Sequence, residues 1–333
     1  MASPSHSVLV IGCGSIGERH LRCFQKSGRA AVAVCDTNAS LVKEVAERYG
    51  VPGFTHLDEA LEHFQATAWV ICTPAQTHLS LALKGLSTEA HLLIEKPLAV
   101  DLQQVAAVRA AMAGTASHVA VAYVYHSMPW VQGMREALAS GVIGPPKHAT
   151  LVAGQHFPTF RPAYREIYYT RHESGGGAIQ DALTHVANMA EWILGPTQRL
   201  FCDAAHQVLE GVEVEDTVNI IARNGDTLVT YALNQFQAPN EMEFRVHGPL
   251  GSLAMQGHER RWGLQMAGET GWEWYVAPPA DRDEWFVRQA NGFLDGVEGI
   301  PSPLATFEEA VQTLKFNIAA LESARSGSQI TLV

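Results

Sequence analysis

The sequence predicts an α/β protein with a doubly wound parallel sheet, followed by a second α+β domain with an open, largely antiparallel sheet. The first part rests on short, continuously apolar runs that alternate with helical segments through the first 125 residues. The second part rests on a change beyond about residue 146, where apolar runs follow one another as hairpin-like pairs. The length of 333 residues fits two domains. We place them at residues 1–125 and 126–333, with a C-terminal helix able to pack back on the first domain.

Hydrophobic runs and helix signals locate the elements of the first domain. Buried strands are expected at residues 8–12, 31–36, 68–72, 91–95 and 119–123. Helices are expected between them at residues 15–27, 39–49, 75–87 and 101–113. Asp101 and Gln104 form a capping-box-like start for the last helix. This alternation is typical of a doubly wound sheet with helices on both faces.

Strands dominate the second domain. They are expected at residues 147–157, 200–208, 217–223, 227–236, 241–247 and 252–256. Asn224-Gly225 predicts a hairpin turn, and two helices at residues 283–298 and 306–326 close the chain, the second capped by Thr306 and Glu309. Apolar–polar alternation is weak on both faces of these strands. One face is therefore expected to contact another subunit in a homodimer or homotetramer.

Charge and composition exclude several classes of partner. The net charge of −11 argues against nucleic acid and against an anionic membrane surface. No apolar stretch approaches the length of a membrane span, and the first seven residues lack a signal-peptide core. The five cysteines form no C-x-x-C pair, which fits a reducing compartment. We expect a cytoplasmic protein without a metal site.

A glycine motif follows the first apolar run. In G-x-G-x-x-G, Gly12 permits the tight turn, Gly14 lets a pyrophosphate approach the backbone, and Gly17 lets helix and strand pack closely. The N–H groups at the helix start, at Ser15 and Ile16, attract the phosphates. Such glycines often mark plain turns, so the motif needs its context of a preceding strand and a correctly spaced acid.

That acid is Asp36, which ends the second apolar run 19 residues after Gly17. Its carboxylate is placed to accept hydrogen bonds from an adenosine ribose diol and would repel a 2′-phosphate. Neither Thr37 nor Asn38 is basic. The sequence therefore predicts a dinucleotide-binding Rossmann domain that prefers NAD to NADP.

A candidate catalytic lysine follows the predicted strand 91–95, in the sequence Glu95-Lys96-Pro97. Ligands of doubly wound sheets bind outside the carboxyl ends of the strands, so Lys96 is expected to face the cofactor. Pro97 sets the exit of the chain and is able to adopt a cis peptide bond. The alternative is a surface lysine paired with a carboxylate.

The second candidate segment runs from the triple glycine at residues 175–177 into a helix that ends near Leu194. Asp181 and His185 are four residues apart and share one face of that helix. The glycines would let a substrate or nicotinamide approach the backbone. The alternative is an acid favoured by the helix dipole and a histidine bonded in the core. The apolar positions expected to be buried are 179, 182, 183, 186, 189, 190 and 193.

Taken in order, five segments resemble the Gfo/Idh/MocA family over essentially the whole chain. They are GCGSIG, CTPAQTH (72–78), EKP (95–97), GGGAIQDALTH (175–185) and the C-terminal PSPLATFEEAVQTLKFNIAALESARSG. The resemblance implies an NAD(P)-dependent oxidoreductase that acts mainly on sugars, cyclitols and sugar derivatives. It also implies the two-domain fold described above, with a second-domain sheet face that often forms dimer or tetramer contacts.

The resemblance also implies roles for individual residues. Lys96 would be the catalytic lysine, and Asp181 and His185 would complete the catalytic set, with His185 as the acid/base. Beyond the glycine loop and Asp36, the cofactor-binding residues would be Thr73, Pro74, His78, Glu95 and Lys96.

Residues 121–129 depart from the family pattern, which commonly reads Y-N-x-R-x-x-P. Val124 and His126 stand where Asn and Arg are frequent, which leaves the substrate open. Tyr125 and His126 are the substrate-binding candidates in this segment, beside Lys96, Asp181 and His185.

A loop at residues 156–172 combines basic and aromatic residues in an otherwise acidic chain. Guanidinium groups fit carboxylates and phosphates, so Arg161, Tyr164 and Arg165 are candidates for binding an acidic sugar. The alternative is a surface loop whose arginines pair with Glu166 and Glu173.

Three function classes fit these features. The leading one is an NAD-dependent dehydrogenase or reductase acting on a carbinol carbon of a sugar, cyclitol or sugar-acid derivative. The second is a redox-neutral enzyme that uses NAD for a transient oxidation and so cleaves a glycosidic bond. The third is a nucleotide-sensing regulator, which would not need to keep both Lys96 and His185.

Overall fold

The computed structural model describes residues 5–281 and 283–332. The chain divides into two compact units, each described here by itself. The first unit comprises Met1–Ser127 and Ala280–Phe307, and the second comprises Met128–Pro279 and Glu308–Val333.

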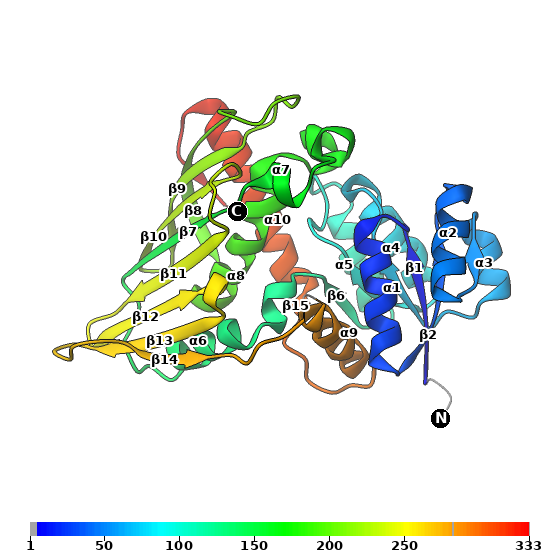
Figure 1. Ribbon diagram of the computed structural model, residues 1–333, viewed down its shortest axis with the longest axis horizontal. Helices are drawn as coiled ribbons and strands as arrows, with labels where there is room; N and C mark the ends of the chain where they lie inside the picture. Colours follow the sequence, from blue (N-terminus) through cyan, green and yellow to red (C-terminus); the bar gives the residue numbers. More distant parts are fainter. Residues whose placement is uncertain (1–4, 282, 333) are drawn as a thin grey trace. The chain divides into compact units, whose positions relative to one another are not determined.

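A seven-stranded sheet forms the centre of the first unit, in the order β15-β6-β5-β4-β1-β2-β3. Figure 1 labels β15, β6, β1 and β2 of this sheet. Its strands are β1 (His6–Ile11), β2 (Ala30–Cys35), β3 (Gly53–Phe54), β4 (Ala68–Ile71), β5 (His91–Ile94), β6 (Val119–Val121) and β15 (Ala305–Thr306). Strands β1 to β6 run parallel, and β15 is antiparallel to β6. The chain leaves β1 toward β2 on one side, while β4 lies on the other side. Because ligands bind where the strand order reverses, this edge is the expected ligand position.

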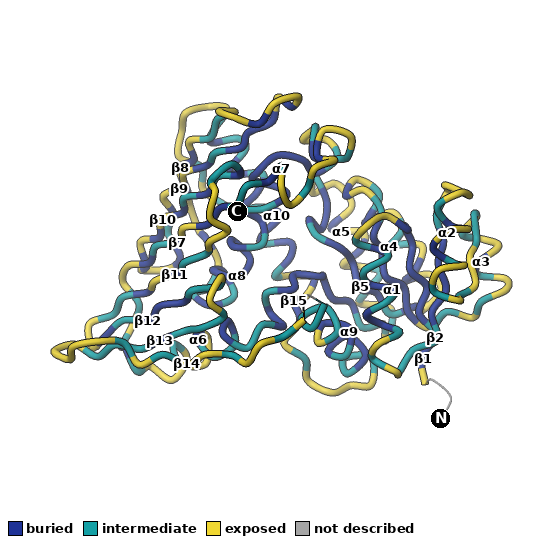
Figure 2. The backbone as a smooth tube through the Cα atoms, in the orientation of Figure 1, coloured by how far each residue is buried: buried dark blue, intermediate teal, exposed yellow. Residues whose placement is uncertain are grey.

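The central strands consist mainly of buried residues, which Figure 2 draws in dark blue. Leu9 in β1, Trp69 in β4 and Leu93 in β5 are each 0% exposed. Strands covered by helices on both faces need apolar side chains at every position, which explains their continuous apolar runs. The predicted doubly wound sheet is confirmed.

Helices of the first unit are α1 (Ser15–Ser27), α2 (Ala39–Tyr49), α3 (Leu57–His63), α4 (His78–Ser87), α5 (Val105–Ala113) and α9 (Glu284–Val297). Two expected starts were wrong. A 3-10 turn occupies Ala75–Thr77, and α4 begins only after it. The capping box at Asp101 does not form, because its carboxylate accepts from the N–H of Gln103 at 2.9 Å and makes a local turn. Strand β3 and helix α3 were not predicted.

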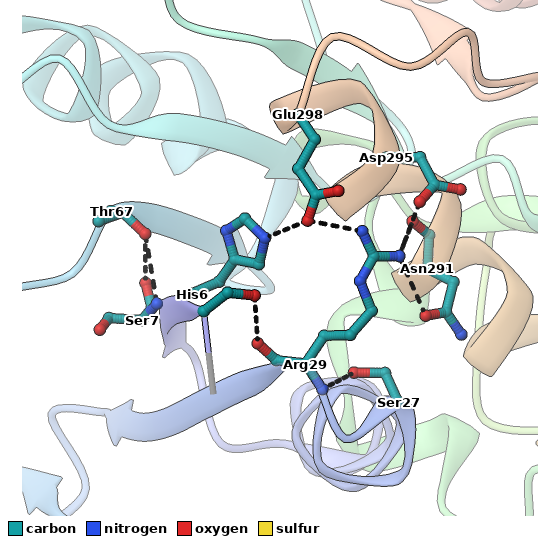
Figure 3. Close-up of polar contacts among 9 residues, drawn as sticks. His6, Ser7, Ser27, Arg29, Thr67, Asn291, Asp295 and Glu298 are labelled. Carbon is teal, nitrogen blue, oxygen red and sulfur yellow. Dashed lines mark hydrogen bonds and ion pairs between the residues drawn. The ribbon is translucent and has the colours of Figure 1, made fainter. Parts of the chain in front are cut away.

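Helix α9 packs against α1, and polar contacts at the start of β2 hold its C-terminal end (Figure 3). Arg29 places Nη1 2.7 Å from Asp295 Oδ1 and Nη2 2.8 Å from Glu298 Oε1. The His6 ring lies 2.7 Å from the same Glu298 oxygen. Residues 280–307 were predicted to belong to the second domain, with only a C-terminal helix able to pack back on the first. Here the whole segment belongs to the first unit.

A nine-stranded sheet forms the second unit, in the order β14-β13-β12-β11-β7-β10-β9-β8-β16. Its strands are β7 (His148–Gly154), β8 (Thr197–Ala205), β9 (Thr217–Asn224), β10 (Thr227–Asn234), β11 (Glu241–His247), β12 (Gly251–Gln256), β13 (Arg261–Met266), β14 (Glu273–Val276) and β16 (Ile330–Thr331). Every neighbouring pair is antiparallel except β7 with β10. The predicted hairpin is confirmed, because Asn224 pairs with Thr227 across a turn in which Gly225 has φ +57°.

The helices of the second unit are α6 (Pro129–Ala139), α7 (Phe157–Phe160), α8 (Thr184–Leu194) and α10 (Phe307–Ser326). Buried polar contacts join α8 to α10. Glu191 accepts from Gln312 Nε2 at 3.0 Å and from the Thr313 hydroxyl at 2.9 Å, and burial raises the pKa of this carboxyl. In the described part of the chain, no helix combines the length and apolarity that crossing a membrane requires.

Candidate active site

The glycine loop joins β1 to α1, and its three glycines have different surroundings. Gly12 has φ +97°, and a Cβ there would lie 2.6 Å from the Cys72 carbonyl oxygen. A Cβ on Gly17 would lie 1.8 Å from the Gly12 carbonyl oxygen, so helix and strand could not approach as they do. A Cβ on Gly14 would meet nothing within 4 Å. The backbone at Gly14 is therefore open to a ligand, as a pyrophosphate requires.

The N-terminus of α1 also fits an anion. Gly14 is the N-cap residue, and no side chain caps the helix. Its first N–H groups have no intrahelical acceptor, and the helix dipole favours negative charge beside them. The acid of the first turn, Glu18, is turned toward Arg48 and Tyr49, at 2.6 and 2.7 Å.

Asp36 follows β2 and is held by two backbone donors. Its Oδ2 accepts from the N–H of Cys13 at 2.7 Å, and its Oδ1 accepts from the N–H of Asn38 at 2.9 Å. The carboxylate therefore lies against the glycine loop. Each of its oxygens has a further lone pair, so the diol of an adenosine ribose can donate to it. Loop, helix terminus and acid together fit NAD.

Replacing Asp36 with Ser is expected to weaken NADH binding about tenfold to a hundredfold and to narrow the preference over NADPH. A hydrogen bond to a charged group contributes about 1.5–3 kcal/mol, and the repulsion of a 2′-phosphate disappears. The measurement is the dissociation constant of each reduced nucleotide by fluorescence. Asp101→Ser is the matched control, because Asp101 also holds a turn through its own carboxylate. An unchanged NADH-to-NADPH ratio would contradict the assignment.

The turn after β4 and the loop after β5 are joined by His78. Its Nε2 lies 2.7 Å from the Thr73 carbonyl oxygen, and its Nδ1 lies 3.0 Å from the Pro97 carbonyl oxygen. The ring is 1% exposed, and burial lowers the pKa of this histidine. His78 is therefore a buried spacer between two loops, and its contact with the cofactor stays a prediction. Thr73 is half-buried and Pro74 is exposed, so both remain within reach of a ligand.

Glu95 also turns inward. One carboxylate oxygen lies 2.7 Å from His20 Nε2 of α1, and the other accepts from the N–H of Lys96 at 2.9 Å. Burial opposes ionisation of Glu95, but the hydrogen bond and charge of His20 outweigh it, and the pKa of Glu95 is lowered. Glu95 therefore holds the backbone of the next residue, and its predicted place among the cofactor-binding residues stays a prediction.

His20 is a site residue that the sequence analysis missed. It is 0% exposed and shares the buried face of α1 with Gly17, Leu21 and Phe24. A histidine among the apolar residues of a helix face indicates that its ring has a buried hydrogen-bond partner, but the sequence does not identify which residue that partner is. Lys96 itself is half-buried at the carboxyl end of β5, and the Lys96–Pro97 peptide bond is cis.

In the second unit, Asp181 lies in a π-helical turn (Ile179–Leu183) that leads into α8. The N–H of Thr184 bonds to the carbonyl of Ile179, five residues earlier. The sequence analysis expected regular α-helix here. A spacing of four is close to one turn in either kind of helix, so Asp181 and His185 still share a side. Asp181 is 7% exposed and His185 is half-buried.

Tyr168 is a second residue that was missed. Its hydroxyl donates to Asp181 Oδ1 at 2.6 Å. It lies in the loop that the sequence analysis singled out for its arginines. Of the positions expected to be buried on this helix, Ala182 is only half-buried and the others are buried.

The loop residues proposed for an acidic substrate make contacts of their own. Tyr164 is 2% exposed and donates to the carbonyl of Glu210 at 2.8 Å. Arg165 donates to the same carbonyl at 2.8 Å and reaches the Glu210 carboxylate at 3.4 Å. Both side chains therefore hold the loop together, and Arg165 pairs with Glu210 instead of Glu166 or Glu173. Arg161 is half-buried and forms no ion pair within residues 5–281 and 283–332.

Tyr125 and His126 lie in a 3-10 turn after β6 (Val124–Ser127). His126 is 0% exposed, and its Nδ1 lies 2.9 Å from the Pro303 carbonyl oxygen. The ring therefore holds two segments of the first unit together, which argues against direct contact with a substrate. Burial raises the pKa of Tyr125 to about 12, so its hydroxyl stays protonated at neutral pH.

Comparisons with known proteins agree with this organisation. Residues 6–123 match the family model described as an oxidoreductase family with an NAD-binding Rossmann fold, and residues 131–254 match the Gfo/Idh/MocA C-terminal domain. The chain is 26% identical over 335 residues to a 1,5-anhydro-D-fructose reductase of Ensifer adhaerens, covering 96% of each protein. It is 23% identical over 319 residues to an inositol 2-dehydrogenase of Rhizobium meliloti (strain 1021), covering 94% of this chain and 92% of the relative.

The fold is shared with solved structures. A levoglucosan dehydrogenase, in complex with NADH and levoglucosan, superposes with a TM-score of 0.88 at 20% identity. The match covers 98% of this chain and 99% of the other. The glycine loop, Asp36 and the two matched domains thus lead to one conclusion: this chain belongs to the Gfo/Idh/MocA family and is an oxidoreductase with an NAD-binding Rossmann domain.

Proposed function

We propose that the protein transfers hydride between NAD and a carbinol carbon of a sugar, cyclitol or sugar-acid derivative. The observation that carries this proposal lies in the first unit. Lys96 is half-buried at the carboxyl edge of the same sheet whose β1–α1 turn and Asp36 fit the dinucleotide. An ammonium group at that edge is suited to an oxygen of the substrate. The relatives named above act on sugars or cyclitols according to their names, which supports the same substrate class.

In this proposal, three side chains and NAD have separate roles in the reaction. NAD, when bound, accepts or supplies the hydride at its nicotinamide ring. His185 takes the hydroxyl proton of the alcohol during oxidation, since imidazole exchanges protons near neutral pH. The Lys96 ammonium stabilises the negative charge that develops on the same oxygen. Asp181 orients the imidazole and stabilises its protonated form. In reduction, His185 returns the proton.

The test is a substrate screen on the purified protein. Any retained nucleotide is identified first, and sugars, cyclitols and uronic acids are then assayed at the absorbance band of reduced nicotinamide. We expect NADH to accumulate with at least one of them. Product formation without NADH would favour redox-neutral cleavage of a glycosidic bond. Nucleotide binding without turnover on the whole panel would favour a regulatory protein and contradict the proposal.

If the substrate is a sugar acid, Arg161 is a better candidate than Arg165 for binding its carboxylate. The Arg165 guanidinium is already bound to Glu210, whereas Arg161 makes no ion pair in the described ranges. A guanidinium in that state can bind a carboxylate of the substrate. The comparison of uronic acids with neutral sugars in the screen bears on this choice.

We also propose that the second-domain sheet forms the contact of a homodimer or homotetramer. Its outer face exposes apolar side chains on four neighbouring strands, and isolated exposed residues are ordinary whereas such a group is not. They are Val152 of β7 (49%), Phe201 of β8 (38%), Ile221 of β9 (61%) and Leu228 of β10 (50%). Phe201 and Ile221 are direct partners across β8 and β9.

The five cysteines are free and buried, which supports the proposal that the protein works in a reducing, cytoplasmic compartment.

Replacing Ile221 with Glu is expected to convert the oligomer to smaller species. A buried, unpaired carboxylate at a subunit contact costs several kcal/mol, roughly a thousandfold or more in association. Sedimentation velocity measures the change in mass. Val208→Glu is the control, because Val208 is 51% exposed in the loop that follows β8. A wild-type protein that sediments as a monomer would refute the proposed contact.

A further inference from the structure

We infer that Tyr168 is a positioning residue for Asp181, and that Glu215 and His172 hold the Tyr168 loop against the helix that carries Asp181. The inference rests on the proposed function, because it assigns how one member of the proposed catalytic set is aimed. All four residues belong to the second unit.

The contact between Tyr168 and Asp181 is short and shielded. The hydroxyl donates to Oδ1 at 2.6 Å, and Asp181 is 7% exposed. Hydrogen bonds from a hydroxyl to a carboxylate lie in this distance range and are about twice as strong as neutral ones. Tyr168 therefore determines the direction of one carboxylate oxygen.

Glu215 secures the start of the helix. Its Oε1 accepts from the N–H of Ile179 at 2.9 Å, and its carbonyl accepts from the N–H of Ala178 at 2.9 Å. These are N–H groups that a helix start leaves without intrahelical acceptors, and a carboxylate there is also favoured by the dipole. Glu215 is 7% exposed. Hydrogen bonds to Glu215, two residues before β9, therefore hold the helical turn that carries Asp181.

The glycines at 176 and 177 allow the Tyr168 loop and Glu215 to lie close to the start of this helix. Gly177 has φ +85°, and a Cβ there would lie 2.5 Å from Glu215 Oε1. A Cβ on Gly176 would lie 2.2 Å from the Tyr169 carbonyl oxygen. From the sequence, these glycines were expected to let a substrate or nicotinamide approach the backbone. The structure shows that Gly176 and Gly177 admit the Tyr168 loop and Glu215.

The same carboxylate holds the loop. Glu215 Oε2 lies 2.6 Å from His172 Nε2, and this hydrogen bond raises the pKa of His172. Gln180, beside Asp181, donates to the His172 carbonyl at 2.9 Å. The Ser174 hydroxyl donates to the Tyr168 carbonyl at 2.7 Å and closes the loop. The Tyr168 side chain is therefore presented to Asp181 from a segment tied to the helix at several points.

A positioning role predicts a specific kinetic pattern. The Tyr168 hydroxyl touches Asp181, which in turn orients His185. A catalytic group displaced by about 1 Å can lower the rate of the chemical step about a hundredfold. Loss of the hydroxyl should therefore lower kcat and leave nucleotide affinity unchanged.

The test compares Tyr168→Phe with Tyr275→Phe. The Tyr275 hydroxyl donates to the Glu273 carboxylate at 2.7 Å on exposed strand β14, so this variant matches the chemical change without touching Asp181. We expect kcat to fall about tenfold to a hundredfold in Tyr168→Phe only, with the dissociation constant for NADH unchanged in both. In an Asp181→Asn background, Tyr168→Phe should add less than about twofold, because both changes act on one path. Equal losses in the two Tyr variants, or multiplying losses with Asp181→Asn, would overturn the inference.

A second readout does not depend on turnover. The ¹³C shift of the Asp181 carboxyl carbon is measured at pH 7 in wild type and in both variants. We expect this shift to change in Tyr168→Phe and to remain unchanged in Tyr275→Phe. An unchanged shift in Tyr168→Phe refutes the inference even if no substrate is found. Failure of the substrate screen alone contradicts only the proposed function.

Discussion

Replacing Lys96 with Met should abolish most turnover, lowering kcat by about a hundredfold to a thousandfold, while NADH still binds. Removing one preorganised donor from a developing oxyanion has costs of this size. Met keeps the approximate length of the side chain and loses only the charge and the donors. The glycine loop and Asp36 do not depend on that charge, so nucleotide affinity should be nearly unchanged.

His185→Ala should cost a similar factor, about 10²–10⁴, because general acid–base catalysis contributes that much. The measurements are kcat on the best substrate of the screen and the dissociation constant for NADH. Lys84→Met is the control, since Lys84 is an exposed lysine that pairs with Asp58 on the surface. Full turnover in Lys96→Met would refute its catalytic role. Loss of NADH binding would make it a cofactor-binding residue instead.

The second large effect concerns stability. Replacing His20 with Ala should lower the free energy of unfolding by about 3–5 kcal/mol, because it leaves a buried carboxylate without its partner. His20 is 0% exposed and Glu95 is 5% exposed, so water replaces little of the lost interaction. Urea unfolding at pH 7 measures the loss. His63→Ala is the control, because His63 is exposed and its ring nitrogen bonds to the Glu59 carbonyl on its own helix, not to a buried carboxylate.

The loss should depend on pH in a defined direction. The pKa of Glu95 is lowered in the folded protein. Its stabilisation is present above the unfolded value, about 4.3, and is lost as the pH falls through the folded value. The difference between wild type and His20→Ala should therefore shrink in acid. In addition, His20→Ala/Glu95→Ala should lose less than the sum of the single losses. A loss below about 1 kcal/mol at pH 7 would contradict this account of the pair.

Much of the nucleotide half of the site could be predicted because it depends on local backbone geometry. The turn at Gly12, the open approach at Gly14 and the acid at Asp36 all follow from one strand–helix–strand unit. Lys96 could be placed for the same reason, since it directly follows a buried strand. In each case the relevant contacts lie at the ends of elements whose hydrophobic pattern is strong.

The sequence alone determined the two kinds of sheet and the glycine loop, and it supplied the candidates for the catalytic side chains. The tertiary structure decided which polar side chains face inward and with whom. His20 meets Glu95 across 75 positions, and Ile179 meets Glu215 across 36. Arg165, which looked available for an anion, meets Glu210 across 45. A buried polar group needs a hydrogen-bond partner. Which residue becomes that partner depends on how distant segments pack together, and a local sequence pattern contains no information about that packing.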